Sequence, residues 1–299
     1  MKLSIFTPTY NRAEELVRCF ISINKQPLNL LDQTEWIVIN DGSTDSTCEL
    51  IHGLMRNSNV LIRYISQENA GKQAAWNNAV NHARGEFFLG LDSDDELEEN
   101  ALLTIFDDLN KLRRKKKNIA IRYLAEKKDS EGALKVGSSL SKDLIEGSWF
   151  DEFSNPNING ERIDLFKTAV LKSYFFPVEK NIKYIPEYWF FCSVSHDGFL
   201  FCYSPKVVRI IHDTAKVNRL SHDNFNKNAL GHYIAKGKML STIPFICFIK
   251  NPKEYIKTIV RYTQASKITK NKIDSSLPVF HKCLCLLLSI FFTVGGRFE

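Results

Sequence analysis

The sequence predicts an α/β protein built on a mixed, mainly parallel sheet flanked by helices. Strand-like and helix-like segments alternate four times within about the first ninety residues, which is the pattern of a parallel sheet. The segment 87–91 is apolar without alternation, as expected of a strand buried on both faces. Polar loops follow several of these strands directly, where an open α/β sheet places its ligands.

The first two strands are predicted to end in polar loops. The first strand covers Lys2–Thr7, Pro8 ends it, and Asn11 can cap the following helix. The second strand covers Trp36–Ile39. The loop 40–45 contains a glycine for a tight turn and hydroxyl side chains that can cap the next helix.

The third and fourth strands are predicted at Leu61–Ile65 and Phe87–Leu91, with a helix over Lys72–Ala83 between them. The fourth strand ends in three carboxylates, Asp92, Asp94 and Asp95. Crowded carboxylates repel one another unless a cation neutralises them, and a divalent cation on an anionic substrate would do so. The alternative is that they cap the helix predicted at Glu98–Asn110.

Convergence of the loops favours a binding site over capping alone. Parallel strands point the same way, so the loops after the first, second and fourth strands meet at one edge of the sheet. The chain lacks the Gly-x-Gly-x-x-Gly turn, the P-loop and the Gly-x-Ser-x-Gly elbow, which argues against a dinucleotide enzyme, a P-loop nucleotidase and a serine hydrolase.

Composition bounds the class of protein. The 299 residues are 44% hydrophobic and 25% charged, which excludes a disordered or fibrous chain. The net charge of +6 is modest, and we expect no nucleic-acid partner. Seven scattered cysteines without a CxxC pair favour a reducing compartment. Because the chain starts on a strand and not on a signal peptide, a cytoplasmic protein is expected.

Two segments raise the question of a membrane. The basic run Arg113–Lys117 is either a solvated loop or a contact for anionic lipid or phosphate. The apolar stretch Cys283–Val294 is shorter than the roughly 20 residues that cross a bilayer. It either lies in the membrane interface beside basic residues or packs on the protein.

The rest of the chain is less regular. We predict in order a strand at Ile119–Leu124, a loop-rich region at 126–159, a helix at Asp164–Tyr174, a helix opening at Pro186, strands at Phe199–Tyr203 and Val207–Ile211, and helices from Asp223 interrupted near Pro244 and Pro252. These helices form a C-terminal appendage.

Four motifs of the first 110 residues resemble the inverting family 2 glycosyltransferases of the GT-A fold. They are Thr7–Arg12, Asn40–Asp45, Asn69–Lys72 and Asp92–Asp95. The resemblance implies a nucleotide-sugar donor, usually a UDP-sugar, and a Mn²⁺ or Mg²⁺ ion. It implies a glycan or lipid-linked glycan as the acceptor. If the apolar end of the chain binds lipid, the enzyme would lie at the inner face of the cell membrane. The resemblance also implies a catalytic domain over 1–215, with a nucleotide-sugar half at 1–110 and an acceptor half at 111–215, followed by the appendage at 216–299.

The resemblance implies roles for individual residues. Tyr10 would stack on the base, and Asp41 would accept a hydrogen bond from a uracil imide. Asp94 would bind the metal, and Asp92 the ribose or metal. The other implied donor-binding residues are Thr7, Pro8, Arg12, Lys72 and Ser93, of which Arg12 and Lys72 would face phosphate charge.

A catalytic base is implied further along the chain. Ile185-Pro186-Glu187 with Trp189 resembles a bacterial surface-polysaccharide branch of the family, which makes Glu187 the candidate. Tyr188 departs from the pattern, because an Asp commonly follows the base. The plainer alternative is that Glu187 is only an acidic residue at the start of a helix.

Weaker candidates and competing functions complete the expectations. His212 is a weak candidate for the metal site, and Glu161 and Asp164 for the acceptor. Competing functions are a sugar nucleotidyltransferase, which would show a Gly-rich basic loop after the first strand, and a non-catalytic nucleotide-binding scaffold at the membrane.

Overall fold

The structure is a computed structural model that describes residues 1–129, 132–136, 145–155, 161–179, 182–212 and 225–290. The chain divides into two compact units. The first comprises Met1–Gly147, Asn157–Phe175 and Leu200–Asn218, and the second comprises Ser148–Pro156, Phe176–Phe199 and Arg219–Glu299. Residues 148–156 and 176–199 therefore belong to the second unit together with the C-terminal helices.

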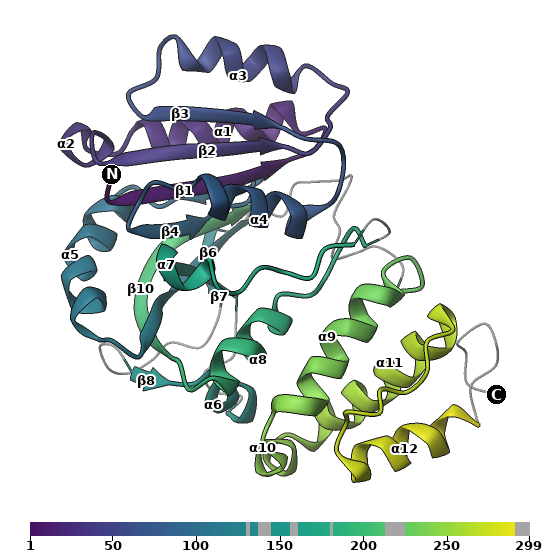
Figure 1. Cartoon of the computed structure of the whole chain (residues 1–299). Helices are drawn as coiled ribbons and strands as arrows, with labels where there is room; N and C mark the ends of the chain where they lie inside the picture. Colours follow the sequence, from purple (N-terminus) through teal and green to yellow (C-terminus); the bar gives the residue numbers. More distant parts are fainter. Residues whose placement is uncertain (130–131, 137–144, 156–160, 180–181, 213–224, 291–299) are drawn as a thin grey trace. The chain divides into compact units, whose positions relative to one another are not determined.

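A single mixed sheet forms the core of the first unit (Figure 1). Its strands are β1 (Leu3–Thr9), β2 (Thr34–Asn40), β3 (Leu61–Ser66), β4 (Phe87–Gly90), β5 (Glu96–Leu97), β6 (Asn118–Asp129), β7 (Gly132–Val136), β8 (Ile145–Gly147), β9 (Arg162–Lys167) and β10 (Leu200–His212). They lie in the order β3-β2-β1-β4-β9-β6-β10-β5, with β7 on β6 and β8 on β10. The four strands from β3 to β4 are parallel, whereas β9 is antiparallel to both neighbours. The predicted fold class is confirmed.

Helices cover both faces of this sheet because successive strand residues point to opposite sides. The helices of the first unit are α1 (Ala13–Asn24), α2 (Leu28–Leu31), α3 (Thr47–Met55), α4 (Lys72–His82), α5 (Ala101–Arg114) and α7 (Thr168–Leu171). Leu3 and Ile5 of β1 share one core with α1 and α5. Phe6 of β1 and Phe88 of β4 instead contact Trp76 of α4. Because β4 is packed on both sides, its sequence is apolar without interruption.

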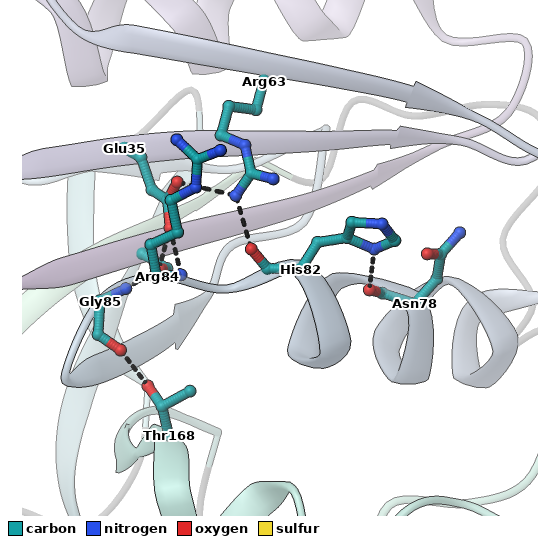
Figure 2. A network of polar contacts seen from close by, with 8 residues as sticks. Glu35, Arg63, Asn78, His82, Arg84, Gly85 and Thr168 are labelled. Carbon is teal, nitrogen blue, oxygen red and sulfur yellow. Dashed lines mark hydrogen bonds and ion pairs between the residues drawn. The ribbon is translucent and has the colours of Figure 1, made fainter. Parts of the chain in front are cut away.

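A buried polar network holds the amino-terminal ends of β1 and β2 to the turn between α4 and β4 (Figure 2). The carboxylate of Glu35, which has no exposed surface, accepts hydrogen bonds from the Ser4 hydroxyl at 2.6 Å and the Arg84 amide at 2.7 Å. Arg63 pairs with the same carboxylate at 3.0 Å and donates to the carbonyl of His82 at 2.5 Å. The network therefore fixes the start of β4, the strand that leads to the three acids.

The helix predicted over Asp164–Tyr174 is wrong. Strand β9 runs from Arg162 to Lys167 and takes up the start of this segment, and only the four-residue helix α7 (Thr168–Leu171) follows it. β9 is hydrogen-bonded to β4 on one side and to β6 on the other. Pairing on both edges decides the conformation here, because strand formation depends more on neighbouring strands than on local preference.

Two further expectations of the middle region need correction. The strands predicted at Phe199–Tyr203 and Val207–Ile211 are one strand, β10, whose register against β6 shifts around Pro205. Proline has no amide hydrogen to donate, so it interrupts the ladder without ending the strand. The region expected to be irregular from residue 126 contains the end of β6, then β7 and β8. Residues 130–131, 137–144 and 156–159 of that region lie outside the described residues.

The second unit is helical. Its helices are α6 (Trp149–Ser154), α8 (Tyr188–His196), α9 (Ala229–Thr242), α10 (Phe245–Lys250), α11 (Pro252–Thr269) and α12 (Val279–Ser289). Pro244 is the N-cap of α10 and Pro252 opens α11, so the predicted interruptions fall between helices. The start expected at Asp223 and the residues 291–294 of the apolar stretch lie outside the described part. Within that part, no helix is long and apolar enough to cross a bilayer.

Candidate functional site

The carboxyl ends of four parallel strands meet at one edge of the sheet in the first unit. Register pairs Thr9 with Asn40 and Asn40 with Ser66, so β1, β2 and β3 end level with one another. The amide of Leu91, just beyond β4, donates to the carbonyl of Phe6 at 2.8 Å. The convergence of loops expected from the sequence is therefore present, and the loop after β3 joins it.

The loops after β1 and β2 are tied to each other. Asn11, with a positive φ of 51°, accepts a 2.7 Å hydrogen bond from the Thr44 amide, and its own amide donates to the Ser43 hydroxyl at 2.9 Å. The carboxylate of Asp45 accepts from the amide of Ala13 at 3.2 Å, at the start of α1. The expected cap by Asn11 is wrong, because its side chain is used to join the two loops.

Asp41 organises the loop after β3. Its buried carboxylate accepts hydrogen bonds from the amides of Ala70 and Gly71, each at 2.8 Å, and from the Gln67 side chain at 2.8 Å. A longer bond of 3.3 Å comes from the Asn69 side chain. Both carboxylate oxygens thus have partners in the loop 67–71, which leads into α4.

Each of the three acids after β4 contacts a cation from a different element. Asp92 pairs with Lys72 of α4 at 2.9 Å, and Asp94 pairs with Arg12, before α1, at 2.8 Å. Asp95 pairs with Arg209 of β10 at 2.6 Å. Lys72 and Arg12, expected to face phosphate, therefore contact these acids.

Arg209 is a site residue that the sequence interpretation missed. It lies at the end of a segment that reads as an ordinary apolar strand, and only the sheet order brings β10 near β4. Its guanidinium also lies 4.0 Å from Asp92 and 3.9 Å from Glu161. A positive residue within an apolar strand was the only available signal.

The acids do not cap a helix. α5 begins at Ala101 with Asn100 as its N-cap, well beyond the acids, so the capping alternative is wrong.

The surroundings of these acids give them different pKa values. Burial would raise the pKa of Asp92, but Lys72 and Arg209 together hold it at about 2. Burial raises the pKa of Asp95 to about 7. Arg209 lowers this pKa, but the charges of the neighbouring carboxylates raise it and offset part of that effect.

The remaining donor candidates differ in accessibility. Tyr10 is 39% exposed at the end of β1, whereas Thr7 is fully buried, and its hydroxyl accepts from the Trp36 indole at 2.9 Å. Ser93 is buried between the acids, and Pro8 is half-buried. Tyr10 thus offers a free ring at the strand edge, while Thr7 packs below it in the core.

His212 lies at the end of β10 and contacts an acid other than the three described above. Its Nε2 lies 2.8 Å from the carboxylate of Glu96, which also pairs with Arg18 at 3.3 Å. Burial and the charge of Arg18 lower the pKa of His212.

Asp164, a candidate for binding the acceptor, pairs with Arg122 at 2.7 Å.

A divalent cation suits the kind of ligand at this strand end. Carboxylate oxygens are hard ligands, and Asp94 is partly accessible. Among the residues that the structure places, no three acidic, histidine or cysteine side chains are arranged around a common metal position. A cation held by Asp94 would therefore take further oxygens from a bound anionic ligand.

Glu187, the candidate base, belongs to the second unit. It is exposed and is the N-cap of α8, with Pro186 just before it. Tyr188 explains the departure from the expected acidic pair, because its hydroxyl is buried and Lys236 of α9 lies 4.5 Å from the centre of its ring. Burial raises the pKa of Tyr188 and lowers that of Lys236 to about 8. The position after Glu187 is thus a packing position.

Gly231 of α9 sets the position of the segment before Glu187. A Cβ atom at Gly231 would lie 1.8 Å from the carbonyl oxygen of Tyr184.

We expect Gly231→Ala to lower the free energy of unfolding by about 1–3 kcal/mol, measured by urea denaturation, because α9 would have to move away. Gly53→Ala on α3 is the matched control, since nothing lies within 4 Å of its Cβ position. It should stabilise the chain by up to about 1 kcal/mol. Equal effects of the two changes would contradict the close approach.

Comparisons with known proteins find similar sequences and similar folds. Residues 4–132 match the sequence pattern described as Glycosyl transferase family 2. Over 97% of its length the chain is 25% identical to the GalNAc(5)-diNAcBac-PP-undecaprenol beta-1,3-glucosyltransferase of Campylobacter jejuni, and the match covers 89% of that protein. Three longer bacterial relatives are 32–42% identical over 101–131 residues, and the chain spans only 10–18% of their length.

Two solved structures share the fold. TarS residues 1–349 of S. aureus, in complex with UDP-GlcNAc, aligns with a TM-score of 0.63 and 18% identity over 99% of this chain and 90% of that chain. The mannosyltransferase PcManGT of Pyrobaculum calidifontis, in complex with GDP-Man and Mn²⁺, aligns with a TM-score of 0.58 and 17% identity over 97% and 79%. The expected GT-A fold is confirmed. Residues 4–132 thus match the sequence pattern of glycosyltransferase family 2, and the chain as a whole shares the fold of these two solved structures.

Proposed function

We propose that the protein transfers a sugar from a UDP-sugar to a hydroxyl group of a lipid-linked glycan, with inversion at the anomeric carbon and a divalent cation. The observation that carries this proposal is the set of three acids at the end of β4, each beside a cation from another element. The UDP-GlcNAc complex of TarS supports the donor class, and the undecaprenol-linked substrate in the name of the C. jejuni relative supports the acceptor class.

The nucleotide would bind over the loops after β1, β2 and β3. The exposed ring of Tyr10 offers a stacking surface for the base. Asp41 is rigidly held, and a uracil imide would replace the weakest of its hydrogen bonds, the 3.3 Å contact from Asn69. The other three bonds to the loop 67–71 would keep the carboxylate oriented for this contact.

The diphosphate would bind where the acids and cations meet. Arg12, Lys72 and Arg209 pair with the three carboxylates, which balance their positive charges. A diphosphate therefore brings negative charge to a site with little positive charge to spare. A divalent cation held by Asp94 would supply the missing charge and stabilise the departing diphosphate. Arg12 would then be available to contact phosphate oxygens.

Glu187 would act as the general base. It is exposed and lies at the start of α8 on a segment fixed by the close approach of Gly231. The carboxylate would take the proton of the acceptor hydroxyl as its oxygen bonds to the anomeric carbon, while the bond from that carbon to the diphosphate breaks. A single displacement of this kind inverts the configuration and forms no bond between enzyme and sugar.

The competing functions have less support. A sugar nucleotidyltransferase would need a Gly-rich basic loop after β1, where this chain has Tyr10, Asn11 and Arg12. The lack of an acidic residue directly after Glu187 is the feature that favours a non-catalytic scaffold. The inward packing of Tyr188 accounts for that change without loss of Glu187 itself.

A thermal-shift panel of nucleotide sugars tests the donor and the metal together. We expect at least one UDP-sugar to raise the melting temperature in the presence of Mn²⁺, and a chelator to remove most of the shift, because ligand binding to the native state stabilises it. GDP- and ADP-sugars, with the same diphosphate, are the controls. Stabilisation by a GDP-sugar in place of all UDP-sugars would overturn the donor assignment, and a shift unchanged by chelator would overturn the metal.

A further inference from the structure

The outward face of α12 is apolar, although it is exposed. His281 and Cys285 point inward and are buried. The opposite side carries a stripe at helical spacing: Val279, Phe280, Cys283, Leu286, Leu287 and Ile290, all exposed. A surface helix ordinarily presents polar residues on this side, and exposed apolar patches mark interaction sites.

The stripe continues onto α10. Phe245 is 49% exposed and its ring centre lies 5.6 Å from that of Phe280, which joins the two helices. Ile246 and Ile249 of α10 are 55% and 58% exposed, while Phe248 between them is buried in the core of the second unit. We call these exposed apolar residues of α10, of α12 and of its C-cap the apolar patch: Phe245, Ile246, Ile249, Val279, Phe280, Cys283, Leu286, Leu287 and Ile290.

Positive charge accompanies the apolar patch. Residues 245–290 contain eight lysines and arginines but only two acids, a balance of +6 that equals the formal net charge of all 299 residues. Lys250 directly follows Ile249, Lys253 lies in the first turn of the next helix, and Lys282 lies within α12. Lys253, Lys257 and Arg261 also form an exposed row at four-residue spacing along α11.

We propose that this surface docks peripherally on a bilayer containing anionic lipid. The apolar side chains would enter the interface between headgroups and acyl chains, and the lysines would face the headgroups. A second copy of the chain fits the surface poorly, because a symmetric contact would bring two sets of lysines together. The basic run Arg113–Lys117 is less suited, since Arg113 pairs with Glu86 and Lys115 with Glu146.

Vesicle sedimentation with the full chain tests the proposal without any substrate, so it is independent of the transfer reaction. We expect binding to vesicles of phosphatidylglycerol and phosphatidylcholine that weakens with salt, and little binding to phosphatidylcholine alone. Ile249→Ser with Leu287→Ser should weaken it by about 100-fold. Leu28→Ser on α2 is the matched control, because Leu28 is 63% exposed, close to the 60% of Leu287. It should bind as the unaltered chain does.

The charge contribution is measured separately. Lys250→Gln with Lys253→Gln should weaken binding by about 25-fold, roughly fivefold for each lysine. Arg114→Gln with Lys117→Gln, in the basic run, should leave binding unchanged. The reverse ranking of these two double variants would move the docking site to the basic run and overturn the proposal.

Cys283 reports insertion directly. It is the exposed cysteine on α12, so a polarity-sensitive fluorophore can be attached there in a Cys48→Ser background. We expect its emission to shift to the blue when anionic vesicles are added. Unchanged emission with bound vesicles would overturn the proposed orientation. The patch would instead belong to a contact with a second copy under two conditions. Light scattering would show a dimer that the Ile249→Ser and Leu287→Ser double variant dissociates, and the unaltered chain would not bind vesicles.

Discussion

Replacing Glu187 by glutamine is expected to reduce sugar transfer by about 10²–10⁴-fold. The amide keeps the size of the side chain but cannot take the proton from the acceptor hydroxyl. Because Glu187 is exposed at the start of α8, its loss should not disturb the core of the second unit. The loss should appear in kcat, while the thermal shift produced by the UDP-sugar and Mn²⁺ stays unchanged.

Glu179→Gln is the matched control for this change. Glu179 is also exposed in the second unit, so the same substitution there removes the same charge without touching the proposed base. We expect transfer at the level of the unaltered enzyme. A Glu187→Gln enzyme that retains full kcat would remove Glu187 as the base and leave it as the acidic first residue of a helix.

Replacing Asp94 by asparagine is expected to lower kcat/KM by about 100-fold or more and to abolish its dependence on Mn²⁺. The amide is a poor ligand for a hard cation, but it can still accept a hydrogen bond from Arg12, which pairs with Asp94 at 2.8 Å. The fold should therefore survive. Initial rates across a Mn²⁺ titration, together with the donor-induced thermal shift, measure the effect.

Asp107→Asn on α5 is the control, because Asp107 is an exposed acid outside the strand-end loops. It should respond to Mn²⁺ as the unaltered enzyme does. Transfer by Asp94→Asn that still rises with Mn²⁺ over the same concentration range would exclude Asp94 as the metal ligand. A second outcome is a UDP-sugar that raises the melting temperature of the unaltered enzyme without metal but not that of this variant. The defect would then lie in the loop and not in cation binding.

Most of the strand-end site could be located from the sequence. The apolar run before Asp92 is packed on both faces, and its lack of alternation is visible in the chain itself. The loops that carry Tyr10 and Asp41 follow similar strands, and parallel strands bring such loops to one edge without further information. Asp41 was expected in the site, but the four bonds that tie it to the loop 67–71 were not.

Two errors occurred where pairing across the sheet decides the outcome. Asp164 was placed on a helix because its neighbours allow one, but β9 is bonded between β4 and β6. Arg209 escaped notice because nothing near it in the chain indicates that β10 comes close to the acids. Strand order is a long-range property, so a short window of sequence contains no record of it.

The sequence alone thus determined the α/β class and the loops that bear Asp41 and Asp94, since these depend on periodicity and on residues that follow one another along the chain. Only the tertiary structure decided that Arg12, Lys72 and Arg209 contact the acids, and that the apolar side of α12 faces outward. A side chain's partner depends on which elements pack together, and that is set by burial of the whole chain and not by its local pattern.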